Sequence, residues 1–336
     1  MNAENEYPKT LLEAVRYFSD ANVATEFFAK MRWPEGVRCP HCGSADVAYL
    51  ANQRRWQCKE KHPRRQFSAK VGTIFEESPL GLDKWFVAVW CITNAKNGIS
   101  SCELARALGV TQKSAWFMLH RVRHAMHCGS FEKFAGVCES DETYVGGAAS
   151  NMHLSRRKAK IQGRGAMGKA IVHGVLERGD KAKKVTSKVK ANVVGNAKRT
   201  TLVPEVRNVV QAGSTVYTDA LASYNYLSAY YVHEVIDHAK EYVRGAVHTN
   251  GMENFWSLLK RAISGTYVSV DAPHLQRYVD EEAFRFNERK LDDGQRFFVV
   301  MPGTIGRRIT YKQLIGKDDV ENLPASDEAG NGDLPN

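Results

Sequence analysis

Four residues between positions 141 and 260 have side-chain types suited to metal-dependent phosphodiester chemistry. Asp141 lies in a strand-like run, Asp219 ends another, Glu253 follows 34 residues later, and Lys260 comes seven residues after Glu253. Hard divalent cations such as Mg²⁺ prefer carboxylate oxygens. Two such ions about 4 Å apart can activate a water or a 3′-hydroxyl and stabilise the leaving oxygen of a phosphodiester. The three carboxylates therefore form a candidate metal site, with Lys260 as a candidate phosphate contact.

A helix over about 251–264 would hold Glu253 and Lys260. Its apolar residues recur at helical spacing and form one stripe, namely Met252, Phe255, Trp256, Leu259 and Ile263. Glu253 and Lys260 share one edge of this stripe, about 10 Å apart along the helix axis. A second interpretation stays open: Asn250 as N-cap would put Glu253 at N3, where its carboxylate need only bind backbone N–H groups.

The elements around these residues alternate between strands and helices from Gly136 onward. We expect strands near 137–145, 170–176, 184–189, 214–218 and 232–236, and helices near 203–211 and 251–264, with a short helix after Asp219. This order predicts an α/β fold, a mixed sheet covered by helices. Structural alternatives remain, because Asp219 could be a helix N-cap and Asp141 a solvated strand residue. Glu139 or Glu142 could also take the place of Asp141.

A second metal site is indicated in the N-terminal part. Cys39 and Cys42 form a C-x-x-C pair, and Cys58 follows fifteen residues later, with His62 four places beyond it. Four N and S ligands at this separation are typical of a zinc ribbon, in which they complete a tetrahedron around Zn²⁺. His41 is the alternative to His62, and ordinary buried or surface thiols are the alternative to a zinc site.

A helix-turn-helix pattern follows the ribbon. A short helix at 101–108, a turn at Gly109, an N-cap at Thr111 and a longer helix produce this pattern. The face opposite the apolar stripe of the longer helix offers four candidate DNA-binding residues, namely Lys113, His120, Arg121 and His124. A purely structural helical hairpin would have the same pattern.

Charge points to a polyanionic partner such as nucleic acid. The formal charge of the 336 residues is +10, and residues 317–336 hold one basic and six acidic side chains, so the body carries +15. We expect that acidic tail to be disordered. The GRGAMGK segment at 163–169 is not an ATP site, because Ala170 stands where Ser or Thr should hold magnesium. No long apolar run or signal-peptide pattern is present, so we expect a cytoplasmic, nucleoid-associated protein with no membrane partner.

Several stretches between Arg32 and Arg289 together resemble a known family. They are RWPEGVRCPHCGS, VGTIF, DETYVGG, YTDALASY, HTNGMENFWSLLKR and HLQRYVDEEAFRFNER. With the spacing of the three carboxylates and the lysine, they make the chain similar to the DDE transposases of bacterial insertion sequences. The similarity is greater still to the group with an N-terminal zinc ribbon. The chain departs from that pattern at His62, since the ribbon usually has a cysteine two residues after Cys58.

The resemblance implies a ribonuclease H-like catalytic domain that uses Mg²⁺ or Mn²⁺. By position, Asp141, Asp219 and Glu253 would be the metal ligands, and Lys260 would contact DNA. It further implies an enzyme that binds the terminal inverted repeats of its element and catalyses strand cleavage and strand transfer. The partners would be double-stranded DNA, at the element ends and the target, and further copies of the chain. A DNA-binding regulator on an inactive scaffold and a metal-dependent DNA nuclease are the alternatives.

These interpretations divide the chain into six segments. We expect N-terminal helices at 1–35, a zinc ribbon at 36–75, a helix-turn-helix-like region at 80–130, a ribonuclease H-like domain at 135–290, a C-terminal extension at 291–316 and an acidic tail at 317–336.

Overall fold

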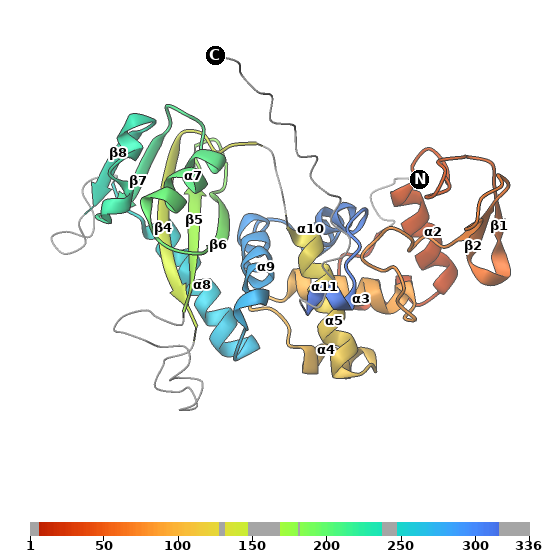
Figure 1. Ribbon diagram of the computed structural model, residues 1–336. Helices are drawn as coiled ribbons and strands as arrows, with labels where there is room; N and C mark the ends of the chain where they lie inside the picture. The colour runs from red at the N-terminus through yellow and green to blue at the C-terminus, as the bar shows by residue number, and fades with distance from the viewer. Residues whose placement is uncertain (1–6, 128–131, 147–168, 181, 237–246, 316–336) are drawn as a thin grey trace, which may run out of the picture.

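Two lobes make up the computed structural model, which describes residues 7–127, 132–146, 169–180, 182–236 and 247–315. In Figure 1 the sheet lobe lies on the left, a small ribbon lies on the right, and helices occupy the space between them. No helix in the described part is long and apolar enough to span a bilayer. Residues 163–168 of the GRGAMGK segment and the predicted disordered tail at 317–336 lie outside the described residues.

The larger sheet confirms the predicted mixed topology. Its strands are β4 (Val137–Val145), β5 (Ala170–Glu177), β6 (Lys188–Val194), β7 (Thr215–Asp219) and β8 (Val232–Ile236). They lie in the order β6-β5-β4-β7-β8, with β4, β5 and β6 antiparallel and with β7 and β8 parallel to β4. Numbered along the chain, this order is 3-2-1-4-5, the ribonuclease H-like arrangement that the resemblance implies.

Some predicted bounds were wrong. The strand expected at 184–189 runs from Lys188 to Val194, because the chain first makes a loop. Lys184 has a left-handed backbone with φ of 56°, and the N–H of Val185 donates to the carbonyl of Asp180 at 2.9 Å. The short helix expected after β7 consists of two 3₁₀ turns, Ala222–Tyr224 and Leu227–Ala229.

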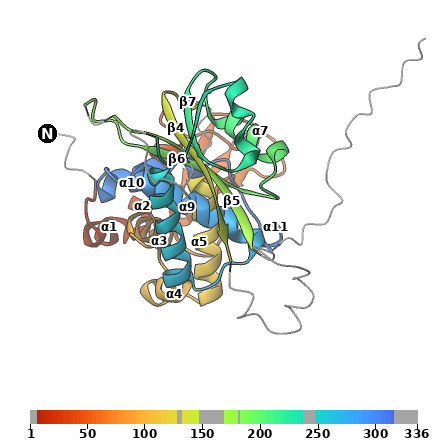
Figure 2. The same cartoon turned by 90° about the vertical axis from the view of Figure 1, so that its left-hand side faces the viewer.

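Helices cover both faces of the sheet (Figure 2). The helices are α7 (Arg199–Val209) on one face, and α8 (Asn250–Arg261) and α9 (Leu275–Asn287) on the other. Along β4 the side chains alternate: Cys138 packs with the residues of α7, whereas Val145 packs with those of α8 and α9. Odd-numbered residues of β4 therefore point to what we call the α8 face. A π-helical turn (Ala262–Tyr267) and a 3₁₀ turn (Ala272–His274) connect α8 to α9.

The other lobe has one hydrophobic core, built from both ends of the chain. Its N-terminal elements are α1 (Leu11–Phe18), α2 (Ala21–Arg32), β1 (Val47–Leu50), a 3₁₀ turn (Ala51–Gln53), β2 (Arg55–Cys58), β3 (Gln66–Phe67), α3 (Leu82–Asn94), α4 (Ser101–Leu108) and α5 (Gln112–Met126). Its C-terminal elements are α10 (Asp293–Val300), a 3₁₀ turn (Pro302–Thr304) and α11 (Tyr311–Leu314). Phe297 of α10 packs against Phe18 and Phe86, so residues 291–315 complete this core. The six segment boundaries stay a prediction.

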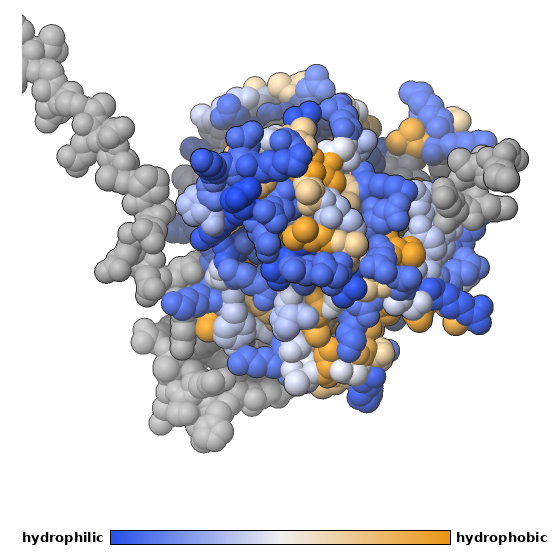
Figure 3. All heavy atoms as spheres, turned by 90° about the vertical axis from the view of Figure 1, so that its right-hand side faces the viewer, coloured by the Kyte–Doolittle hydropathy of each residue, from blue (hydrophilic) through white to orange (hydrophobic). Residues whose placement is uncertain are grey.

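The surface on the side of the ribbon is mainly hydrophilic, with a few hydrophobic areas (Figure 3). Leu11, Leu12 and Val15 of α1 fit the apolar side of an amphipathic helix in sequence but are exposed by 42–59%. The buried side chains of α1 are instead Ala14 and Phe18. Helix α1 therefore contacts the core through Ala14 and Phe18, a narrower stripe than the positions of its leucines predict.

The four predicted zinc ligands lie together in the ribbon. The side-chain ligand atoms of Cys39, Cys42, Cys58 and His62 are all within 4.8 Å of one another. Cys39 Sγ lies 3.4 Å from His62 Nε2, and Cys42 Sγ lies 3.7 Å from Cys58 Sγ. Such a cluster has the donor set and compactness of a tetrahedral Zn²⁺ site. His41 is nearby, with its ring centroid 5.9 Å from that of His62, but it is not in the cluster.

A buried ionic cluster joins the two lobes. Arg123 of α5 pairs with Glu281 of α9, with 2.6 Å between Nε and Oε2, and both side chains are at most 1% exposed. Arg285 pairs with Glu281 and Glu282, and the hydroxyl of Tyr267 donates to Glu281. Two cations and two carboxylates therefore balance inside the interface, which fixes α5 against α9.

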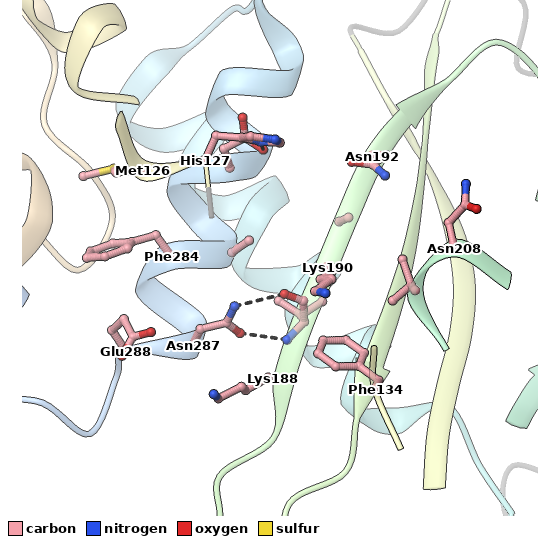
Figure 4. Close-up of a pocket in the computed structure, with 15 residues that line it drawn as sticks. Met126, His127, Phe134, Lys188, Lys190, Asn192, Asn208, Phe284, Asn287 and Glu288 are labelled. Carbon is pink, nitrogen blue, oxygen red and sulfur yellow. Dashed lines mark hydrogen bonds and ion pairs between the residues drawn. The ribbon is translucent and has the colours of Figure 1, made fainter. Parts of the chain in front are cut away.

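Side-chain amides of α9 cover the outer edge of the sheet. The amide of Asn287 accepts a hydrogen bond from Val189 N at 2.7 Å and donates to Val189 O at 3.0 Å (Figure 4). Gln276 bonds to Val193 N and Ala191 O in the same way. β6 is an edge strand, and an open edge can pair with another chain. The two amides occupy the positions of a further strand.

Loss of zinc should unfold the ribbon. We expect about one zinc per chain by metal analysis, and Cys58→Ser should lose it because one of four ligands is removed. Residues 36–70 should then become sensitive to protease. His62→Ala should also lose zinc, whereas His41→Ala should retain it; the opposite result would exchange the two histidines in the ligand set.

Replacing Asn287 should weaken the sheet edge. Asn287→Leu keeps the side-chain size but leaves the N–H and C=O of Val189 without these partners, which should cost about 1–3 kcal/mol of unfolding free energy. Urea denaturation measures the change. Asn208→Leu, on the exposed side of α7, is the matched control and should cost much less. Equal losses in the two variants would show that the amide cap contributes nothing specific.

Candidate active site

The sheet brings Asp141 and Asp219 to neighbouring strands on one face. β4 and β7 are parallel, with Val137 opposite Thr215 and Glu139 opposite Tyr217. Two residues further in the same register, Asp141 falls opposite Asp219. Asp141 is an odd-numbered residue of β4 and therefore points to the α8 face. Tyr217 lies outside the core under α7, and Asp219, two residues on, shares its side of β7.

Helix α8 packs directly on this face through the predicted apolar stripe. Met252, Phe255, Trp256 and Leu259 are buried, while Glu253 and Lys260 are exposed along one edge. Close approach depends on Gly174 of β5, which lies opposite Asp141. A Cβ atom there would be 2.4 Å from Met252 and 2.8 Å from Trp256. Trp256 Nε1 thus reaches Asp141 and donates to its Oδ2 at 2.9 Å.

The start of α8 differs from the capping interpretation. The N-cap is Thr249, and Asn250 is the first helical residue, so the expectation that Asn250 caps the helix is wrong. The carboxylate at the helix N-terminus is that of Glu139, whose Oε2 accepts from Met252 N at 2.9 Å. Gly251 permits this approach, since a Cβ there would be 2.8 Å from Glu139 Oε2. A carboxylate on β4 of the sheet therefore binds a backbone N–H group at the start of α8.

Glu139 also has a cationic partner. Arg178 Nε donates to Glu139 Oε1 at 2.6 Å, and Arg178 Nη2 also contacts His248 Nδ1 at 2.7 Å. Glu139 is 1% exposed. This network was absent from the sequence interpretation, and its only signal was an acidic residue in phase with Asp141. A carboxylate already bound to a guanidinium and a helix terminus is less suited than Asp141 to hold a dication.

Glu142 lies on the opposite face of the sheet from α8. Its Oε2 accepts a hydrogen bond from the Tyr224 hydroxyl at 2.6 Å. Burial, opposed by this hydrogen bond and reinforced by the charges of Asp219 and Asp141, raises the pKa of Glu142 to about 7. Glu142 therefore has its own neutral donor and a strong tendency to keep its proton.

The charge of Asp141 depends on the two other candidate ligands. Burial raises the pKa of Asp141 to about 6; the Trp256 hydrogen bond opposes this, and the charges of Asp219 and Glu253 add to it. The negative charges of Asp219 and Glu253 thus lie close enough to act on Asp141. Repulsion of this kind is relieved by a proton or by a divalent cation. The donor set is therefore suited to Mg²⁺ or Mn²⁺.

The predicted DNA-binding face of α5 needs correction. His120 is fully buried and Arg121 is 4% exposed, so the expectation that these two side chains contact DNA is wrong. Arg121 Nη1 donates to the carbonyls of Ile74 and Glu76, each at 2.8 Å. Helix α5 packs against α3 and α9 along much of its length, which uses the face expected to be free.

Lys113 and His124 have different environments. Lys113 is exposed in the first turn of α5, and its ammonium lies 4.9 Å from the ring centroid of Tyr311. His124 is half-buried, and burial lowers its pKa, as do the charges of Arg277 and Arg307. A helix-turn-helix reads DNA with the N-terminal residues of its second helix. DNA contact by Lys113 stays a prediction, and His124 is poorly placed for it.

Comparisons with known proteins agree with this architecture. The chain matches the ISXO2-like transposase domain over residues 133–287 and a transposase zinc-ribbon domain over residues 19–61. It is 29% identical, over 287 residues, to a protein in transposable element ISH50 of Halobacterium salinarum, covering 81% of this chain and 94% of that protein. No solved structure matches the chain.

The chain is also similar to a second, shorter transposase-like protein. The chain is 32% identical, over 105 residues, to a transposase-like protein of Haemophilus influenzae, which is 31% of this chain and 85% of that protein. The matched domains coincide with the two parts of the structure that hold the candidate metal sites. The chain belongs to the insertion-sequence transposases that carry an N-terminal zinc ribbon.

Proposed function

We propose that this chain binds the terminal inverted repeats of an insertion sequence and catalyses metal-dependent DNA cleavage and strand transfer. The observation that carries the proposal is the position of Asp141: it lies on the α8 face, in register with Asp219, and the charges of Asp219 and Glu253 raise its pKa. In this proposal these three carboxylates hold Mg²⁺ or Mn²⁺. Lys260 contacts a DNA phosphate from the same edge of α8 as Glu253.

The chemistry consists of two displacements at phosphorus. A water oxygen attacks the phosphodiester at the element end, and the 3′-oxygen leaves as a 3′-hydroxyl. That hydroxyl then attacks a phosphorus of the target DNA and displaces the 3′-oxygen of the target strand. The bound ions supply activation of the attacking oxygen and stabilisation of the leaving one. In this proposal the ions would be held by Asp141, whose carboxylate accepts a hydrogen bond from Trp256, by Asp219 and by Glu253 of α8.

The remaining assignments belong to the same proposal. Cys39, Cys42, Cys58 and His62 hold Zn²⁺ and keep the ribbon folded, and Lys113 contributes to DNA binding. The protein acts in the cytoplasm, on the nucleoid, because its substrates are the two element ends and the target DNA. One such site per chain and two ends per element favour a homo-oligomer on DNA. Presence of all three carboxylates favours an enzyme over a regulator on an inactive scaffold.

Glu253→Gln should separate catalysis from folding. The substitution replaces a charged metal ligand by a weaker neutral one, so Mg²⁺-dependent cleavage should fall by about a hundredfold or more. DNA affinity should persist, and unfolding free energy should change by less than about 1 kcal/mol because the residue is exposed. Gel assays with a labelled element end measure both cleavage and joining of the 3′-hydroxyl to target DNA. Cleavage without joining would identify a nuclease.

Two matched variants make this result specific. Glu35→Gln changes an exposed glutamate in the other lobe and should cleave at the parent rate. Glu142→Gln tests the alternative ligand and should keep most activity, since its carboxylate binds Tyr224 on the opposite face. A Glu253→Gln protein at near the parent rate, together with an inactive Glu142→Gln protein, would overturn the proposed ligand set.

Metal binding should weaken as pH falls through about 6. Asp141 must lose its proton to bind a dication, and its folded-state pKa of about 6 exceeds the usual value. Without metal, the folded state holds this proton more tightly than the unfolded state, so this group's contribution to stability declines as pH rises from about 4 to about 6. Added Mg²⁺ should therefore raise the melting temperature more at about pH 7.5 than at about pH 5. Asp141→Asn should abolish that difference, and an unchanged difference would exclude Asp141.

A further inference from the structure

A basic cleft lies beside α8, where the end of α3 approaches α8 and α9. Its volume is about 830 Å³. We define the basic cleft by six of its lining residues, namely Lys96, Asn97, Asn254, Arg261, Arg285 and Arg289. It is formed by both lobes, because Lys96 and Asn97 follow α3 whereas the other four residues belong to α8, α9 and the turn after α9.

Positive charge in the basic cleft exceeds negative charge. The two acidic lining residues, Glu282 and Asp293, are already in ion pairs with Arg285 and Arg296. Among the described residues, no acidic side chain forms an ion pair with Lys96, Arg261 or Arg289. Three exposed cations therefore surround one cavity without compensation. Such a concentration of positive charge attracts an anion with several charges.

The floor of the basic cleft adds a buried donor. Arg285 is 8% exposed, and its Nε has no hydrogen-bond partner in the described part of the chain. The ionic cluster to which Arg285 belongs is balanced, because Arg123 and Arg285 face Glu281 and Glu282. The charges below the cleft therefore do not neutralise the three cations at its rim. A buried N–H without a partner costs free energy, so it adds to the positive potential beneath the cleft without being neutralised there.

Arg289 is held in place by its surroundings. Its Nη1 donates to the carbonyl of Ser187 at 2.9 Å, and its guanidinium lies 4.2 Å from the ring centroid of Phe286. Asn97 and Asn254 are exposed at the cleft and bring side-chain amide donors. Guanidinium and amide N–H groups together are the donors that bind phosphate oxygens in DNA complexes.

The basic cleft adjoins the candidate active site on the same helix. Glu253 and Lys260 lie along one edge of α8, and the next residue after each, Asn254 and Arg261, lines the cleft. Consecutive residues of a helix are about 100° apart around its axis. A strand bound at the carboxylates can therefore pass around α8 and enter the cleft within one helix diameter.

We propose that the basic cleft binds backbone phosphates of the DNA that flanks the reacting phosphodiester. This inference rests on the proposed function, since it takes DNA as the polyanion. The cleft positions DNA and does not touch the reacting atoms. Because one wall follows α3 and the other is α8 and α9, bound DNA contacts both lobes at once.

The salt dependence of DNA binding tests the cleft. Each phosphate contact adds about 0.9 to the slope of log affinity against log salt. The variant Lys96→Gln, Arg261→Gln, Arg289→Gln should therefore lower the slope by about 2 to 3, measured by fluorescence anisotropy on duplex element-end DNA with the full chain and no added Mg²⁺. Arg261→Gln alone should lower it by about 1. Arg16→Gln, an exposed arginine of α1, should leave it unchanged. Equal slopes for the parent and the triple variant would overturn the proposal, as would an equal change in Arg16→Gln.

DNA with a single uncharged backbone linkage tests which phosphate the basic cleft contacts. Replacing a flanking phosphate that occupies the cleft by an uncharged methylphosphonate should weaken DNA binding by the parent protein severalfold. The same replacement should leave the DNA affinity of the Arg261→Gln variant unchanged. Identical profiles of parent and variant would overturn the proposal even if the triple variant fails to fold, since Arg261 is exposed. Failure of the proposed function has a different result: the parent protein would bind these duplexes without cleaving them when Mg²⁺ is added.

Discussion

Close contact between α8 and the sheet at Gly174 determines the geometry of the candidate active site. Absence of a side chain at this position lets Met252 and Trp256 lie against β5, and Trp256 then reaches across to the Asp141 carboxylate. The same docking positions Glu253, on an exposed edge of α8, relative to the face of the sheet that bears Asp141 and Asp219. A methyl group at Gly174 would displace α8 and separate the carboxylates, because the neighbouring side chains are buried and closely packed.

Two acidic residues of β4, Glu139 and Asp141, have different electrostatic environments. Glu139 is neutralised by Arg178 and by the N-terminal N–H groups of α8, which favour negative charge through the helix dipole. Asp141, two residues further on the same face, accepts hydrogen bonds from Trp256 and from the backbone of Glu142, and the charges of Asp219 and Glu253 raise its pKa. The Glu139 carboxylate therefore stabilises the start of α8. The Asp141 carboxylate instead lies where burial and like charges disfavour its ionised form.

Positive and negative charges also balance in the buried interface between the lobes. Complete burial of Arg123 and Glu281 would be costly for either alone, since an unpaired buried charge destabilises by several kcal/mol. Burial raises the pKa of Glu281, but the charges of Arg285 and Arg123 outweigh it, so the net pKa is lowered and the carboxylate stays ionised. This pairing of α5 with α9 joins the two lobes that together form the basic cleft.

Local sequence determined much of the fold. The helix 101–108, the N-cap at Thr111 and the strand 232–236 follow from apolar spacing, capping residues and β-branched runs, which act within a few residues. The apolar stripe of α8 was likewise evident, as was the set of residue types at the two metal sites. The tertiary structure decided what these elements face. Three features depend on contacts between distant segments. They are the burial of His120 and Arg121, the hydrogen bond from the start of α8 to Glu139, and the packing of residues 291–315 on the N-terminal core. Periodicity tells which side of a helix is apolar, but a polar side chain is buried or exposed according to which partner packs against it, and that partner is far away in the chain.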